Sequence, residues 1–208
     1  MRTRIVFAAA VLTTVAALGT GPFAQDEGRG ARQGGAGGGR GGGRGFNLPP
    51  LLMATDAFPD GGIVPQKYVG RGGVQPAFTF SNAPAGTVSY AIIFHDLDVG
   101  LQNGTGDVLH WVAWNIPASA NGLPEGKLPD GSVQGNNITG QPGYMGPGAP
   151  AGPRYHHYVF ELYALNANLD IPQTSSRDDV LKAMQGKVVA KAAYVGRFRQ
   201  GEAPAPGR

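Results

Sequence analysis

The sequence of 208 residues contains no cysteine. A disulfide, a cysteine-linked lipid anchor and a cysteine nucleophile are therefore excluded, and the fold has to be stable through its core alone. The hydrophobic content of 41% is sufficient for that. Once the two ends are set aside, the remaining length corresponds to one ordinary domain.

An apolar run near the N terminus, Ile5 to Leu18, is too short to span a membrane comfortably. It follows Arg2 and Arg4 and precedes several small residues, which is typical of a secretory signal. We therefore expect residues 1–24 to be a signal peptide, with cleavage after Gly19 as the alternative. The mature protein is expected to be periplasmic or secreted, without stable membrane insertion.

Residues 25–46 are dominated by glycine and arginine and bury too little apolar surface to fold. We expect a disordered tether there and a disordered tail at 201–208. An RNA-binding role for the tether is disfavoured, because no aromatic residues alternate with its arginines to stack on bases. Residues 1–46 hold six Lys/Arg against two Asp/Glu, whereas residues 47–208 hold eleven against twelve. The predicted domain at 47–200 thus has no excess positive charge to attract nucleic acid.

Residues 47–200 consist of short β-rich runs between turns rich in Gly, Pro, Asn and Asp, so most of this domain is expected to be sheet. The predicted strands lie in "QPAFTFS", "TVSYAIIFH", "VLHWVAWNIP", "YHHYVFELYAL" and "KVVAKAAYVGRF". One helix is predicted near the C terminus in "SSRDDVLKAMQG". Ser175 or Ser176 would cap it, two aspartates occupy its first turn and Gly186 ends it.

Alternation along three of these strands predicts core-facing stripes that end in polar groups. The stripes are Val88, Tyr90, Ile92, Phe94 and Asp96; His110, Val112, Trp114 and Ile116; and His156, Tyr158, Phe160, Leu162 and Ala164. His157 falls on the opposite face of its strand. All four histidines of the chain, His95 included, lie in these segments near Asp96 and Asp98. We therefore expect a functional pocket at one edge of a sheet.

Three motifs resemble the phosphatidylethanolamine-binding protein family, and in particular its bacterial, Raf-kinase-inhibitor-like branch. They are "HDLD" at 95–98, "HWVAWNIP" at 110–117 and "GYMGPGAPAGPRYHHYVFELYALN" at 143–166. The resemblance covers roughly residues 47–200. It implies a mainly β fold: a β-sandwich with a large central sheet, a smaller flanking sheet and a C-terminal helix.

The resemblance also implies a small anion-binding pocket. The ligand-binding residues carried over by position, together with the glycine of the preceding loop, are Asp96, Asp98, His110, Gly146, His156 and Tyr158. Leu97 and Gly100 replace the prolines of the family's first motif, which makes the loop after that strand less rigid. Imidazole and phenol groups donate hydrogen bonds to phosphate oxygens, and a glycine-rich turn can add backbone N–H groups.

Other chemistries also fit parts of this pattern. Histidines with an aspartate can hold Zn²⁺, but the core-facing tyrosine and the glycine-rich loop favour an anion, so we expect neither metal nor cofactor. The hydrolase motifs G-x-S-x-G and H-E-x-x-H are absent. Three classes of function remain open: a binding module for a phosphate-bearing or other small anionic ligand, a protein-interaction or inhibitor module, and an enzyme that uses the His/Asp pocket for acid–base chemistry. The first is favoured, because no nucleophile is visible.

Overall fold

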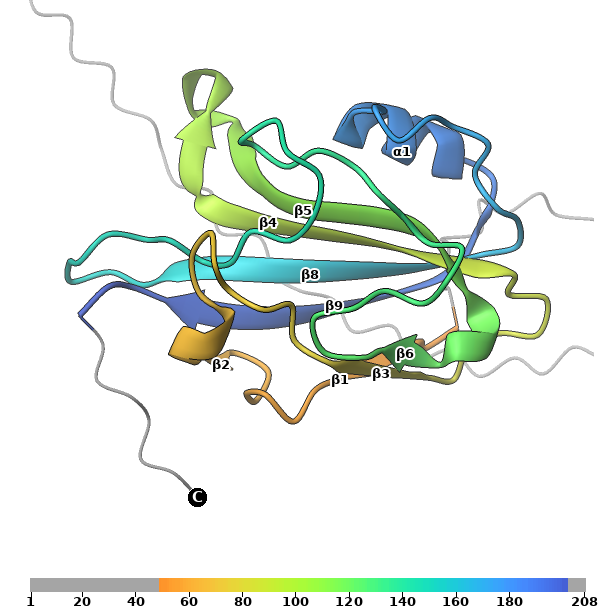
Figure 1. Cartoon of the computed structure of the whole chain (residues 1–208), viewed down its shortest axis with the longest axis horizontal. Coiled ribbons are helices and arrows are strands. Elements are labelled where there is room, and N and C mark those ends of the chain that lie inside the picture. The colour runs from red at the N-terminus through yellow and green to blue at the C-terminus, as the bar shows by residue number, and fades with distance from the viewer. Residues whose placement is uncertain (1–48, 202–208) are drawn as a thin grey trace, which may run out of the picture. The chain divides into compact units, whose positions relative to one another are not determined.

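The computed structural model describes residues 49–201 (Figure 1). The predicted signal peptide and tether, and all but the first residue of the predicted tail, lie outside these residues. The strands in the described part are β1 (Leu52–Ala54), β2 (Gly62–Ile63), β3 (Phe78–Ser81), β4 (Ser89–Leu101), β5 (Gly106–Pro117), β6 (Gly122–Leu123), β7 (Val133–Gln134), β8 (His156–Leu165) and β9 (Val188–Phe198). The α-helix α1 spans Arg177–Met184, and three short 3₁₀ turns occur at 66–68, 102–104 and 118–120.

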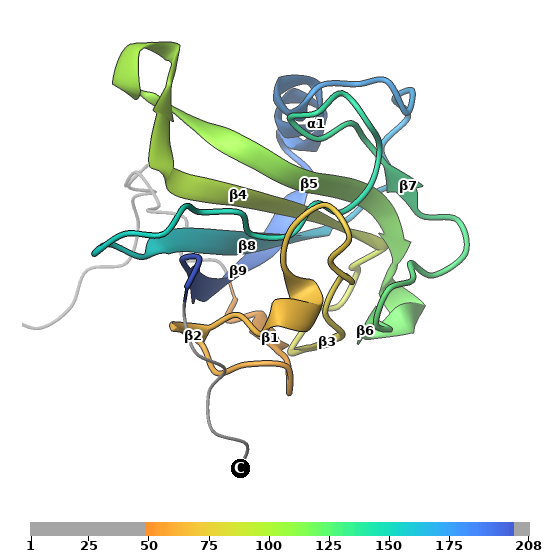
Figure 2. The same cartoon turned by 60° about the vertical axis from the view of Figure 1, so that its left-hand side comes forward.

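Two sheets form the domain. The central sheet has the order β2-β9-β8-β4-β5-β7, and the flanking sheet has the order β1-β3-β6. The long strands β4, β5, β8 and β9 pair antiparallel with their neighbours, whereas the short edge strand β2 pairs parallel with β9. Figures 1 and 2 show the flanking sheet on one face of the central sheet and α1 on the other.

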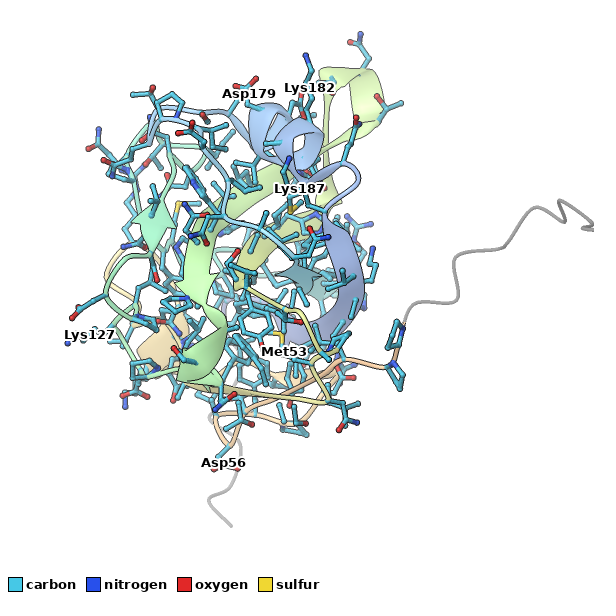
Figure 3. The ribbon with its side chains drawn as sticks, turned by 90° about the vertical axis from the view of Figure 1, so that its right-hand side faces the viewer. Met53, Asp56, Lys127, Asp179, Lys182 and Lys187 are labelled. Atoms are coloured by element: carbon cyan, nitrogen blue, oxygen red, sulfur yellow. The ribbon has the colours of Figure 1, made fainter. Side chains whose placement is uncertain are left out.

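The main core lies between the two sheets and is built around aromatic rings. Phe160 of β8 stacks on Phe94 of β4 with ring centroids 3.9 Å apart, and Phe78 of β3 contacts Phe160 from the flanking sheet at 4.9 Å. Each large buried ring removes apolar surface from water and contributes about 1.5–3 kcal/mol. The flanking sheet is therefore held by side-chain packing against the central one. Met53 of β1 belongs to the same core, and Figure 3 labels it within the body of the domain.

A second, smaller core lies beneath α1 on the outer face of the central sheet. Val180 and Met184 of the helix are buried there, against strand residues that include Trp114 and Tyr163. The helix starts with a capping box, in which the Ser176 side chain accepts from the Asp179 N–H and the Asp179 carboxylate accepts from the Ser176 N–H. Figure 3 shows Asp179 and Lys182 on this helix. The prediction of a helix capped by a serine and followed by Gly186 is confirmed.

The predicted fold class is confirmed: the domain is mainly β, with a large sheet, a smaller sheet and a helix near the C terminus. Each of the five strand predictions corresponds to an observed strand, namely β3, β4, β5, β8 and β9.

The predicted stripe His110, Val112, Trp114 and Ile116 is wrong. Val112 and Trp114 pack in the outer core, whereas Ile116 packs between the sheets. The register between β4 and β5 shifts twice, between Tyr90 and Ile92 and between Phe94 and His95. Such bulges insert residues that simple alternation cannot foresee.

Candidate functional site

Asp96 is the centre of the polar cluster at the strand ends. It lies on β4, directly opposite Tyr158 of β8, and only 2% of its surface is exposed. Its Oδ2 lies 2.8 Å from Nδ1 of His156, and its Oδ1 accepts the backbone N–H of Asp98 at 2.9 Å. The Tyr158 hydroxyl is a third hydrogen-bond partner of this carboxylate. Because a buried carboxylate has to be compensated by donors, these contacts explain how Asp96 can lie inside the domain.

His110 is also buried, with 4% of its surface exposed, and its ring packs against Phe94 and Tyr158 at centroid distances of 5.4 and 5.2 Å. Its Nδ1 lies 2.9 Å from the carbonyl oxygen of Met145. A carbonyl only accepts, so Nδ1 carries the proton and Nε2 of the neutral ring is an acceptor. Burial lowers the pKa of His110, although backbone hydrogen bonds to Met145 and Gly146 and the charge of Asp96 oppose this shift. At neutral pH the ring is therefore uncharged.

The hydroxyl of Tyr158 connects the cluster to the glycine- and proline-rich loop. It accepts the backbone N–H groups of Gly148 at 3.2 Å and Ala149 at 2.9 Å. Burial, followed by the charge of Asp96, raises the pKa of Tyr158 well above its ordinary value, so the phenol stays protonated. The loop N–H groups that were expected to face an anion thus bind the phenol oxygen in this structure.

Gly146 is required by the close approach of two loops. A Cβ at this position would lie 2.1 Å from the carbonyl oxygen of Tyr68. Its N–H donates to the carbonyl of Gly70 at 2.9 Å, so it is also committed within the chain. The glycine holds the segment that contacts His110 against residues 68–70. Its place in the site is thus a structural one.

The side chain of Asp98 lies apart from this cluster. It accepts from the backbone N–H of His157 at 2.7 Å and lies 2.9 Å from Nδ1 of the same residue, with Arg154 at 3.9 Å. Burial would raise the pKa of Asp98, but the contacts with His157 and Arg154 outweigh it and the pKa is lowered. The structure therefore brings Asp96, His110, His156 and Tyr158 together, places Gly146 beside them, and pairs Asp98 with the exposed His157.

His95 belongs to a second polar cluster on the outer face of the sheet. Its Nδ1 lies 2.5 Å from Oδ2 of Asp107, whose other oxygen pairs with Arg177 of α1, and its Nε2 lies 3.6 Å from Glu161. The sequence reasoning grouped His95 with the other histidines and did not find Asp107 or Arg177. Alternation alone would have separated His95 from Asp96, because consecutive strand residues point to opposite faces.

The candidate site is closed by its own side chains. Three cavities of about 350, 410 and 330 Å³ occur in the described structure, and their linings include Tyr68, Arg177 and Trp111 respectively but none of the six predicted site residues. The His156 side chain, 13% exposed, is the most accessible of the four clustered residues. A ligand would therefore meet His156 first and would have to displace neighbouring groups to reach the rest.

Within residues 49–201, no group of three or more His, Asp or Glu side chains is arranged to hold a metal ion. In the same part of the chain, no helix has the length and apolar character needed to cross a bilayer.

Comparison with known proteins agrees with this architecture. Residues 54–199 match the family described as "Phosphatidylethanolamine-binding protein". The UPF0098 protein of Methanothermobacter thermautotrophicus is 41% identical over 155 residues, covering 72% of this chain and 99% of that protein. LppC, a Mycobacterium tuberculosis protein named as a lipoprotein, is 33% identical over 151 residues and is covered over 72% of its length, as is this chain. The crystal structure of Escherichia coli YbcL superposes with a TM-score of 0.66 at 28% identity, covering 72% of this chain and 98% of YbcL.

The two-sheet fold with a polar cluster at its strand ends is that of a phosphatidylethanolamine-binding protein. The chain belongs to the phosphatidylethanolamine-binding protein family. The resemblance inferred from the three motifs is thereby confirmed.

Proposed function

We propose that this protein binds a small anion of the phosphate type, such as a phosphate-bearing headgroup, at the cluster of Asp96, His110, His156 and Tyr158. One observation carries the proposal: the carboxylate of Asp96 holds His156 through Nδ1 at 2.8 Å, at the most accessible point of the cluster. A carboxylate at Nδ1 stabilises the imidazolium form of the ring and fixes its orientation. Nε2–H of His156 is then available as a charge-assisted donor to an incoming anion.

His110 and Tyr158 give the site further selectivity. Because neutral His110 presents Nε2 as an acceptor, it suits a protonated phosphate oxygen. The Gly148 and Ala149 N–H groups already bind one oxygen, that of Tyr158, and can exchange it for an oxygen of the ligand. Asp96 is fully engaged with its partners, so its role is to orient His156 and not to meet an ammonium group directly.

Calorimetric titration with inorganic phosphate and with phosphoethanolamine tests this proposal. His156→Ala is expected to weaken binding by on the order of 1.5–3 kcal/mol, the range for a charge-assisted hydrogen bond. His157→Ala is the matched control, because its ring lies on the opposite face and is half exposed. If the two variants bind alike, or if the wild-type protein binds neither compound, the proposal is wrong.

The pH dependence gives an independent check on the same site. Donation by the His156 imidazolium requires a proton, so binding should take up protons and strengthen toward mildly acid pH. Phosphate gains charge above about pH 6, which partly offsets the weakening at higher pH. The His156→Ala variant should show a flatter profile than the wild type. Titrations in buffers of different ionisation enthalpy measure the proton uptake directly.

We also propose that the protein is exported. The basic start and short apolar run of residues 1–24 support this, and the relative LppC is named as a lipoprotein. This chain has no cysteine to carry such an anchor, so the exported form would be free of lipid. Expression of the full chain, followed by cell fractionation and N-terminal sequencing, tests the proposal. An unprocessed protein that stays in the cytoplasm would contradict it.

A further inference from the structure

A cluster of basic side chains surrounds the start of β8 and the end of β9. These strands are antiparallel neighbours, and His157 pairs directly with Arg197. Tyr155 immediately precedes β8 and Arg199 immediately follows β9, so all four residues lie at one end of the central sheet. We call Arg154, Tyr155, His157, Arg197 and Arg199 the basic strand end. It flanks His156 of the candidate site on both sides along the chain.

Two guanidinium groups are held beside one aromatic ring in this cluster. The Arg199 guanidinium carbon lies 4.5 Å from the centroid of the Tyr155 ring, and that of Arg197 lies 5.5 Å from it. Arg197 Nε donates to the carbonyl of Gly61 at 2.6 Å, and Arg199 Nη1 donates to the carbonyl of Gly152 at 2.7 Å. Cation–π and backbone contacts thus fix two positive charges at the surface.

The remaining members are well exposed. The Arg154 side chain is 68% exposed and that of His157 is 50% exposed. Asp98 pairs with both and offsets one positive charge, while Asp60 bonds the nearby Val195 N–H. Three arginines therefore face two carboxylates, and the partly titrating His157 adds further positive charge. The local charge is positive even though the sequence outside the N-terminal region is nearly neutral.

An aliphatic side chain lies next to these charges. Leu97 follows Asp96 on β4, the strand beside β8, and 54% of its surface is exposed. The outer face is covered by α1 only over the opposite part of the strands, where residues such as Ile93 and Leu165 are buried (Figure 1). Exposed Leu and half-buried Tyr beside arginines form the combination that suits the interface between water and a bilayer.

We propose that the basic strand end docks on an anionic phospholipid surface. Positive charge attracts anionic lipids, each Lys or Arg near the surface adding to the affinity. Leu97 and Tyr155 would enter the headgroup region, and His156 would then be presented to the same headgroups. The second part of this inference rests on the proposed function, whereas the docking itself does not.

Co-sedimentation with lipid vesicles tests the docking. The full-length wild-type protein should bind vesicles of phosphatidylcholine with phosphatidylserine, bind phosphatidylcholine alone much less, and lose affinity as salt is added. Arg197→Gln combined with Arg199→Gln should weaken binding on the order of tenfold or more. Arg154→Gln should weaken it by a smaller factor, and it avoids any effect on folding because this side chain is largely exposed. Lys127→Gln, in the loop between β6 and β7, is the control that should bind like the wild type (Figure 3).

The outcomes separate this inference from the proposed function. Equal binding to both kinds of vesicle, unchanged binding by the arginine variants, or no sedimentation of the wild type would overturn the docking. Binding to poly-glutamate but not to vesicles would overturn it in favour of an acidic protein partner. If vesicle binding behaves as expected while phosphate titrations of the wild type show no binding, the docking stands and only the phosphate site fails.

Discussion

Replacement of Asp107 by asparagine should destabilise the domain strongly, although Asp107 lies outside the candidate site. Its carboxylate lies 2.5 Å from Nδ1 of buried His95 and pairs with Arg177, so it ties β4 and β5 to α1. Asparagine keeps the shape but removes the charge. Each charge-assisted hydrogen bond contributes roughly 1.5–3 kcal/mol, and the amide can still accept one bond, so a loss of about 3 kcal/mol is expected. For a domain of this size that corresponds to a fall in Tm of about 6–12 °C.

The pH dependence of this loss follows from the pKa of Asp107. Burial would raise that pKa, but the contacts with Arg177 and His95 outweigh it, so the folded-state pKa lies below the ordinary value. A carboxylate with a lowered pKa contributes its full stability above the unfolded pKa of about 4 and loses it as pH falls through the folded value. The difference in stability between wild type and Asp107→Asn should therefore be constant near neutral pH and shrink below about pH 4.

Urea unfolding of the two proteins at several pH values measures both quantities. Asp178→Asn is the matched control, because it removes an exposed carboxylate from the first turn of the same helix. Only a helix-dipole effect of about 0.3–1 kcal/mol is expected there. The reasoning fails if Asp107→Asn costs no more than Asp178→Asn, or if its effect persists unchanged in acid.

Three further predictions concern the candidate site. Gly146→Ala should cost about 2–4 kcal/mol in urea unfolding, because its Cβ would meet the Tyr68 carbonyl at 2.1 Å, whereas Gly148→Ala, with open space around its Cβ, should change stability by less than about 1 kcal/mol. Burial lowers the pKa of His110, so the wild type should lose stability as pH falls from about 6.5 toward the folded pKa, and His110→Gln should lose less over that range; equal slopes in thermal melts would contradict this. Dialysis against a chelator should change neither Tm nor phosphate affinity, because a structural metal would contribute several kcal/mol and its removal would be obvious in both measurements.

The strands and the helix could be predicted because local signals there agree with the tertiary structure. The β8 segment is a regular strand, so alternation correctly separated His156 and Tyr158 from His157. The helix carried its own cap in Ser176. On β5 the same reasoning failed, because bulges against β4 depend on the pairing of two strands and leave no periodic trace in either one.

The contacts of the site could be predicted less well than its members. Asp96 and His156 are 60 positions apart, and their pairing follows only from the β4–β8 register. The partners of the loop N–H groups were also beyond the sequence: a glycine-rich loop can face an anion or a phenol oxygen, and here Tyr158 supplies the oxygen. The motif resemblance gave the residues, whereas the structure gave their hydrogen bonds.

Consecutive residues of β4 serve two different clusters, and this links the stability of the domain to the chemistry of the site. His95 points toward α1 and is held by Asp107, while Asp96 points between the sheets and holds His156. A buried carboxylate keeps its geometry only if its backbone is fixed, because its donors must stay within hydrogen-bond distance. The outer ion network anchors that stretch of β4 from the opposite face. The imidazole of His156 is thus oriented by a carboxylate whose own position depends on a contact with the helix.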